Sequence, residues 1–194
     1  MKHELSLLVA AAATIACASL PQSVPAQDLP GTSAIASPAI DQWSIFGSGE
    51  SHRMMVDQTV PGGYAFVVKT AAAGQNPWDV QAAVATAQPI HSGDVILLAF
   101  WAKALATPPG QPAISVIADI QQNHAPYTRI GDRALNVGTT WKLYYVSGTS
   151  TLDLTPAEAA ATVQLATGAQ EIALGPVFVR NFGPGYDLAR LPVN

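Results

Sequence analysis

The stretch of the chain richest in hydrogen-bonding side chains covers residues 121–129, with the sequence QQNHAPYTR. It brings together three amides, an imidazole, a phenol and a guanidinium. Planar amide and guanidinium groups can hydrogen-bond neighbouring hydroxyl groups, and an aromatic ring offers a flat apolar face. A sugar ring presents both kinds of surface, so this stretch could hold a carbohydrate. The candidate ligands in it are Gln121, Asn123, Tyr127 and Arg129.

A second candidate stretch begins at an Asn-Pro turn, residues 76–77, and continues as Trp78, Asp79, Val80 and Gln81. Because side chains of a strand alternate between two faces, Trp78 and Val80 are predicted to share one face. Asp79 and Gln81 would then share the other. An exposed Trp78 could stack on a sugar ring while Gln81 binds hydroxyl groups. Packing in the core is the alternative role of this ring.

The sequence contains no motif for catalysis, for a metal or for a cofactor. The histidines never occur at a metal-ligand spacing, and the nucleophile elbow, the phosphate-binding glycine loop and the dinucleotide fingerprint are missing. We therefore expect no catalytic residue, no bound metal and no cofactor. A pair of acids for glycoside cleavage would have to come from Glu50, Asp79, Asp119 and Glu171.

The N-terminal residues have the pattern of a secretory leader. Lys2 precedes an apolar run over residues 5–16, and small residues follow before a possible cleavage site. This pattern predicts a signal peptide over residues 1–26 and a secreted or periplasmic protein. Cys17 is the only cysteine, so the cleaved protein would have no disulfide. A lipoprotein anchored at Cys17 is the alternative.

Composition limits the class of the remaining chain. The net charge is −4 and charged residues make up 11% of the sequence, without a basic cluster, which argues against nucleic-acid binding. No apolar stretch after residue 26 is long enough to span a membrane.

Residues 27–40 are predicted to be a linker or N-terminal arm, and residues 41–194 are predicted to form one domain. The sequence does not indicate an oligomeric state.

Short strand-like segments separated by turn signals predict an all-β sandwich or barrel. The predicted strands cover residues 64–70, 78–84, 95–105, 113–121, 141–146, 162–165 and 171–180. Residues 155–161 are predicted to form a single helical turn or a loop. The other tryptophans are predicted to pack in the core or at its edge: Trp43, Trp101 and Trp141.

The alternation is clearest in residues 114–121, where apolar side chains are predicted to face the core: Ile114, Val116, Ala118 and Ile120. The residues between them are predicted to face the other way: Ser115, Ile117, Asp119 and Gln121. A plain solvated position is the alternative for Asp119 and Gln121.

Taken in order, five short motifs resemble the carbohydrate-binding modules of families four and nine, which are galactose-binding-like jelly rolls. The motifs are NPWDVQ at 76–81, HSGD at 91–94, LAFWAKA at 98–104, WKLYY at 141–145 and QEIALGPVFV at 170–179. Residues 181–192 are similar to the junction after such a module at the N-terminus of family-ten xylanase-type glycoside hydrolases. The resemblance covers about residues 40–192.

The resemblance implies a jelly-roll β-sandwich and a secreted, non-catalytic module that binds a polysaccharide or oligosaccharide. It matches Trp78 and Gln81 to the tryptophan-to-glutamine strand of the family, and it places Tyr127 and Arg129 in a loop that often lines the site. Many relatives hold a structural calcium at paired aspartates before the last strand. This chain has Leu-Gly-Pro at residues 174–176, so we do not expect that calcium.

Two other functions remain open. The same sandwich could be a structural or protein-interaction domain of the cell envelope without sugar specificity. A glycoside hydrolase would require a close pair of acids. Exposed and convergent positions of Trp78, Tyr127 and Arg129 would favour sugar binding, and dispersed or buried positions would favour the interaction domain.

Overall fold

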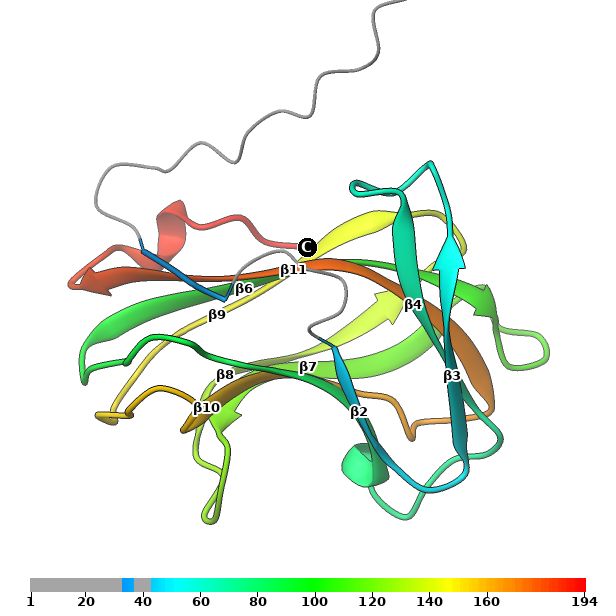
Figure 1. Ribbon diagram of the computed structural model, residues 1–194, viewed down its shortest axis with the longest axis horizontal. Helices are drawn as coiled ribbons and strands as arrows, with labels where there is room; N and C mark the ends of the chain where they lie inside the picture. Colours follow the sequence, from blue (N-terminus) through cyan, green and yellow to red (C-terminus); the bar gives the residue numbers. More distant parts are fainter. Residues whose placement is uncertain (1–32, 37–42) are drawn as a thin grey trace, which may run out of the picture.

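Two antiparallel β-sheets packed face to face make up the protein in a computed structural model that describes residues 33–36 and 43–194 (Figure 1). The six-stranded sheet has the order β3 (Glu50–Val56), β4 (Tyr64–Thr70), β11 (Gln170–Pro184), β6 (Asp94–Ala106) and β9 (Lys142–Thr149), with β1 (Ser33–Ala36) also paired to β11. The five-stranded sheet has the order β2 (Ser44–Gly47), β5 (Val80–Ala85), β10 (Ala159–Gln164), β7 (Ile114–Gln122) and β8 (Arg129–Val137). Two single-turn 3-10 helices complete the described chain: η2 (Pro77–Asp79) and η3 (Leu188–Arg190).

The core fills the space between the two sheets. The alternation predicted for β7 is confirmed, because its four apolar side chains are fully buried: Ile114, Val116, Ala118 and Ile120. Trp43 is buried as predicted, since its ring meets Phe100 edge-on at 6.3 Å and its indole N–H donates to the Gly175 carbonyl at 2.9 Å. None of the described helices is long and apolar enough to cross a membrane.

Four strands lie where the sequence patterns predict none: β1, β2, β3 and β8. β3 is an edge strand that is exposed along most of its length, so it has no alternation of burial to reveal it. β1 lies inside the predicted arm 27–40, and there Ile35 is buried against the core and the strand pairs with β11. The predicted signal peptide, residues 1–26, lies outside the described residues.

The segment predicted as a helical turn or loop divides into two parts. Residues 156–158 form a turn, in which the Thr155 amide donates to the Glu158 carboxylate at 2.7 Å. Residues 159–161 belong to β10, whose alanines are buried between β5 and β7. Close packing between two neighbouring strands therefore overrides the helix-like composition of this segment.

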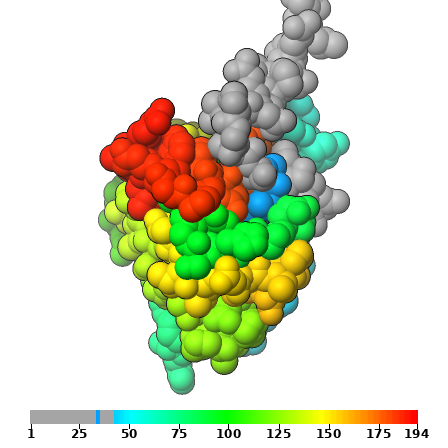
Figure 2. Space-filling model, turned by 90° about the vertical axis from the view of Figure 1, so that its left-hand side faces the viewer, coloured from blue at the N-terminus to red at the C-terminus, as the bar shows by residue number. Residues whose placement is uncertain are grey.

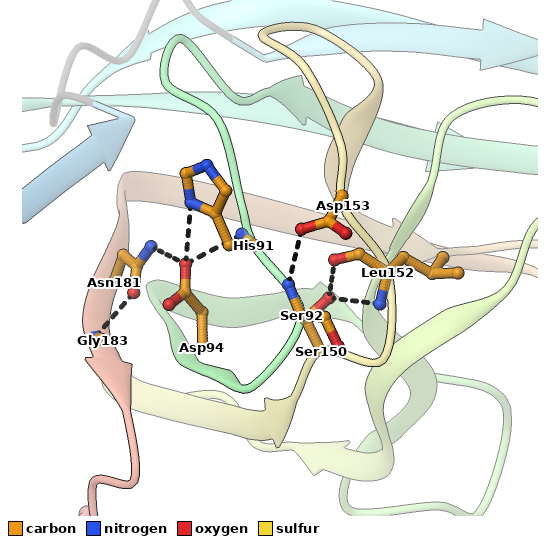
Figure 3. Close-up of polar contacts among 8 residues, drawn as sticks. All are labelled: His91, Ser92, Asp94, Ser150, Leu152, Asp153, Asn181 and Gly183. Atoms are coloured by element: carbon orange, nitrogen blue, oxygen red, sulfur yellow. Dashed lines mark hydrogen bonds and ion pairs between the residues drawn. The ribbon is translucent and has the colours of Figure 1, made fainter.

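Three loops lie side by side at one end of the sandwich, where Figure 2 shows the β5–β6 loop in green, the β9–β10 loop in gold and the β7–β8 loop in lime. Figure 3 shows the polar contacts that hold the first two. The Asp94 carboxylate accepts from the His91 amide at 2.9 Å and from the Asn181 side chain at 2.6 Å. The Ser92 amide donates to the Asp153 carboxylate at 3.0 Å. Asp94 and Asp153 therefore stabilise the β5–β6 and β9–β10 loops through hydrogen bonds.

A second polar cluster fixes the β3–β4 connection to the six-stranded sheet. The Asp57 carboxylate accepts from Lys103 Nζ at 2.6 Å, from Trp141 Nε1 at 3.0 Å and from the Thr59 amide at 3.0 Å. The Lys103 ammonium also lies 4.9 Å from the centre of the Trp141 ring. Hydrogen bonds from Lys103, Thr59 and Trp141, in that order, hold the pKa of Asp57 far below its ordinary value.

This lowered pKa predicts a pH-dependent contribution of Asp57 to stability. A carboxylate whose pKa is lower in the folded than in the unfolded state stabilises the fold above its ordinary pKa of about 3.9, and this stabilisation is lost as the pH falls below it. Asp57→Asn should therefore unfold at lower urea concentration than the wild type at neutral pH, and the difference should shrink as the pH falls from about 4 to about 2. Urea unfolding across that range measures it. A difference that stays constant with pH would contradict the role assigned to the charged carboxylate.

Candidate functional site

The outer face of the five-stranded sheet, turned away from the core, carries a cleft of about 540 Å³. Figure 1 shows η2 and the β7–β8 loop projecting from this same side of the sheet. The cleft is lined from both projections and from the strands between them. Its lining residues are Trp78, Gln81, Gln121, Tyr127, Arg129 and Gln164.

Trp78 reaches the cleft because the chain makes a tight turn before β5. The Asp79 carboxylate accepts from the Asn76 amide at 3.0 Å, and the Asp79 amide donates to the Asn76 carbonyl at 3.1 Å. The hydrogen bond from the Asn76 amide is the main cause of a lowered pKa of Asp79. Proline suits the first position of such a turn, because its φ is already fixed.

The prediction that Trp78 and Val80 share a face is wrong. Residues 77–79 are a 3-10 turn rather than part of the strand, so the period-two alternation starts only at Val80. Val80 is buried, whereas Trp78 is 52% exposed and lines the cleft together with Gln81.

Tyr127 stands on the other wall of the cleft, in the β7–β8 loop. Its amide donates to the His124 carbonyl at 2.8 Å, and the Gln122 amide donates to the Thr128 carbonyl at 2.9 Å to close the loop. Tyr127 has φ of 57°, in the left-handed region that non-glycine residues seldom adopt. The residue is 56% exposed. The loop therefore holds an aromatic ring away from the core at a conformational cost.

Asn123 is the one predicted site residue that does not line the cleft. Its amide donates to the Glu158 carbonyl at 2.7 Å, and its side chain donates to the Ala157 carbonyl at 3.2 Å. Both contacts join the β7–β8 loop to the β9–β10 turn. In this structure Asn123 therefore holds the loop that carries Tyr127.

The floor of the cleft is built from neighbouring strands. Gln81 on β5 lies opposite Gln164 on β10, and Gln121 on β7 lies opposite Arg129 on β8. Arg129 also bonds the Asp132 carboxylate at 3.1 Å, which fixes its guanidinium and offsets its charge. The floor thus presents amides and one guanidinium to whatever occupies the cleft.

Asp119 lies beneath this floor and is completely buried, which overturns the reading of it as a solvated strand position. One carboxylate oxygen accepts from the Thr162 hydroxyl, and the other accepts from Gln164 Nε2 at 2.6 Å. The Arg129 Nε atom is 3.9 Å from the same oxygen. Burial raises the pKa of Asp119, and the two hydrogen bonds and the guanidinium partly oppose this rise.

The side-chain oxygens of Gln81 and Gln164 are both buried, and neither accepts a hydrogen bond from the described residues. A buried acceptor without a donor costs about 1 to 3 kcal/mol. A ligand that brings hydroxyl groups to the cleft could supply the missing donors.

Gln164 is the one lining residue that the sequence analysis does not predict. Thr162 and Gln164 interrupt an apolar strand at alternate positions, and this pattern is the signal that indicates a polar outer face.

An exposed phenylalanine extends the same face beyond the cleft. Phe46 on β2 lies opposite Gln81 and is 53% exposed, while its neighbour Ile45 packs against the core. Gly47 allows β2 to run close to η2, because a Cβ at this position would lie 2.2 Å from the Asp79 carbonyl oxygen. The outer face of β2 therefore adds an apolar surface next to Gln81.

The acids considered for glycoside cleavage do not line the cleft. Glu50 contacts His52, and Glu171 pairs with Arg53 at 2.9 Å.

Across residues 33–36 and 43–194, no three side chains of His, Cys, Asp or Glu form a group that could hold a metal ion. Residues 174–176, which stand where many relatives have the paired aspartates of a calcium site, lie at an irregularity in the pairing of β11 with β6.

Comparison with solved structures identifies the fold. A structure described as "CBM4 structure and function" matches with a TM-score of 0.55 at 18% identity, over 72% of this chain and 94% of that one. The CBM22-1 xylan-binding domain from Paenibacillus barcinonensis Xyn10C matches with 0.57 at 9% identity, over 81% of this chain and 100% of that one. The N-terminal cellulose-binding domain of Cellulomonas fimi β-1,4-glucanase C matches with 0.51 at 19% identity, over 80% of this chain and 99% of that one.

No protein-family model and no curated protein sequence matches the chain. At these identities the structural matches establish the fold, and the predicted jelly-roll β-sandwich is confirmed.

The left-handed backbone at Tyr127 predicts how substitutions there change stability. Tyr127→Gly removes the steric cost of a positive φ. This gain offsets the greater freedom of glycine in the unfolded chain, so the free energy of unfolding should stay equal or rise by up to about 1 kcal/mol. Tyr127→Val places a branched side chain in the same conformation and should lower the free energy of unfolding by about 1 kcal/mol. Urea unfolding of the two variants measures the difference. Equal stabilities would contradict the backbone conformation described for this loop.

Proposed function

We propose that the protein is a non-catalytic carbohydrate-binding module whose cleft holds a polysaccharide or oligosaccharide chain. The observation that carries the proposal is the convergence of two exposed rings, Trp78 and Tyr127, on a floor of amides and a guanidinium. Such rings stack on the apolar faces of sugars, and planar polar groups bind their hydroxyls. None of the described residues that line the cleft carries a carboxylate, which supports binding without cleavage.

The extent of the floor favours a chain of sugars over a single one. Gln164 lies opposite Gln81 at one end, and Ala160, four residues away on the same strand, lies opposite Gln121 at the other. A rise of about 3.3 Å per residue separates these two rows by about 13 Å. This length exceeds one sugar ring, so an oligosaccharide segment fits the floor better than a monosaccharide.

The rigid placement of the lining residues favours a cleft that exists before the ligand arrives. Gln81, Gln121 and Gln164 stand on paired strands, and Trp78 stands on a turn closed by Asp79. A largely preformed site of this kind avoids much of the entropic cost of ordering loops on binding. The open, partly polar surface favours weak, reversible binding of a hydrated polymer.

The similar structures suggest which polymers to test first. Their descriptions name xylan binding, cellulose binding and a complex with xylohexaose. Xylan and β-glucan are therefore the first probes for this cleft. The proposed location is outside the cytoplasm, by way of the signal peptide predicted over residues 1–26, with lipid anchoring at Cys17 as the alternative.

Affinity electrophoresis tests the proposal. The purified protein is run through native gels that contain xylan, β-glucan, pectin, agar or alginate, beside Trp78→Ala and Tyr127→Ala. At least one polymer should retard the wild type, and each substitution should weaken binding about five- to tenfold, since a stacked ring contributes about 1 kcal/mol or more.

Tyr64→Ala is the matched control, because Tyr64 is similarly exposed, at 49%, but lies on β4 of the other sheet. It should migrate like the wild type in every gel. Retardation that survives the loss of both Trp78 and Tyr127 would place the site elsewhere. No retardation in any gel would favour a protein-interaction domain instead.

A further inference from the structure

We propose that Asp119 is a positioning residue that fixes the side-chain amide of Gln164 so that the amide oxygen, and not the nitrogen, is presented to the ligand. The inference rests on the proposed function of the cleft, and it assigns a role to a buried residue that does not line the cleft itself. Asp119 is completely buried, and Gln164 is only 2% exposed although it lines the cleft.

The direction of the Gln164 amide follows from what a carboxylate can do. An ionised carboxylate accepts hydrogen bonds and donates none. The Thr162 hydroxyl occupies one oxygen of Asp119, and Gln164 Nε2 lies 2.6 Å from the other. With Asp119 ionised, turning the amide over would bring two acceptor oxygens together in a buried place, so the carboxylate holds Nε2 toward it and Oε1 away from it, as the structure shows.

Two acceptors result on the floor of the cleft. Gln164 Oε1 is buried without a donor, and so is Gln81 Oε1 on the neighbouring strand, directly opposite in the pairing of β10 with β5. The floor at this point is therefore set to accept hydrogen bonds. Two sugar hydroxyls, each donating to one of these oxygens, would relieve the cost of both, whereas a group that only accepts gains nothing.

The other charged groups around Asp119 leave this arrangement in place. Arg129 on β8 approaches the same carboxylate oxygen at 3.9 Å, but its guanidinium is bonded to Asp132 at 3.1 Å. Arg129 thus stabilises the charged form of Asp119 without replacing the bond from Gln164. Both Gln164 and Arg129 line the cleft, but only Gln164 reaches the Asp119 carboxylate at hydrogen-bond distance, 2.6 Å against 3.9 Å for Arg129 Nε.

Substitutions separate this role from a purely structural one. In Asp119→Asn, the new amide nitrogen can donate to the Thr162 hydroxyl, so the amide oxygen still accepts from Gln164 Nε2. The affinity of this variant for the glycan should be within about threefold of that of the wild type. Asp119→Ala removes the acceptor and frees the amide, and it should weaken binding roughly tenfold. Gln164→Ala should weaken binding by a similar factor.

The double variant is decisive. If Asp119 acts through Gln164, the combination Asp119→Ala with Gln164→Ala should bind no more weakly than Gln164→Ala alone. Calorimetric titration of the purified proteins with xylohexaose and with cellohexaose measures the four affinities, and circular dichroism checks that each variant is folded. Losses that multiply in the double variant would overturn the proposal.

A second measurement does not need a glycan. The side-chain NH₂ signals of Gln164 in a nitrogen-15 NMR spectrum should be shifted from those of a solvated glutamine and slow to exchange in the wild type and in Asp119→Asn. They should move to the position of a solvated glutamine in Asp119→Ala. If the signals are the same in all three proteins, the positioning role is wrong. If the wild type binds no glycan, the proposed function fails, and the NMR result still decides whether Asp119 fixes the amide.

Discussion

The alternation of side chains along the three central strands of the five-stranded sheet, β5, β10 and β7, is the constraint on which the rest of the structure depends. These three strands bury every second side chain against the other sheet, and this fixes which residues face outward. On β7, burial of Ile120 turns Asp119 and Gln121 to the opposite face, and on β10, burial of Val163 does the same for Gln164. A shift of one residue in the register of any of these strands would turn its apolar side chains outward and its polar side chains into the core. The core therefore specifies the position of the polar floor.

Several features that cost folding free energy occur together at the cleft. Tyr127 holds a left-handed backbone, Asp119 is a carboxylate buried beneath a polar surface, and the oxygens of Gln81 and Gln164 have no donor among the described residues. Each of these features opposes folding by an amount of the order of 1 kcal/mol or more. Their concentration in one place is typical of a functional surface, where local stability is given up for recognition. Elsewhere the acids are satisfied, as Asp57 and Asp94 are by several donors each.

Local patterns in the sequence predict much of this arrangement. The alternation in residues 114–121 correctly assigns the buried face of β7, and the loop that follows it carries Tyr127 and Arg129 to the cleft. Gln164 could not be placed in the same way, because its position depends on β10 lying between β5 and β7, and strand order is not a local property. Trp78 was placed on the wrong face because Asn-Pro can open either a strand or a 3-10 turn. The sequence does not predict β3, because the residues of an exposed edge strand do not alternate between buried and exposed positions.

The most direct test of the account follows the indole N–H signals of the four tryptophans by NMR while xylohexaose or a soluble β-glucan hexasaccharide is added. Trp43 and Trp141 donate their indole N–H groups to Gly175 and Asp57 within the protein, and Trp78 stands exposed at the cleft. The account predicts that the Trp78 signal shifts in a saturable way with at least one of these ligands, while those of Trp43 and Trp141 stay in place. A saturable shift of another tryptophan with Trp78 unchanged would contradict the location of the site, and no shift with any glycan would contradict sugar binding itself.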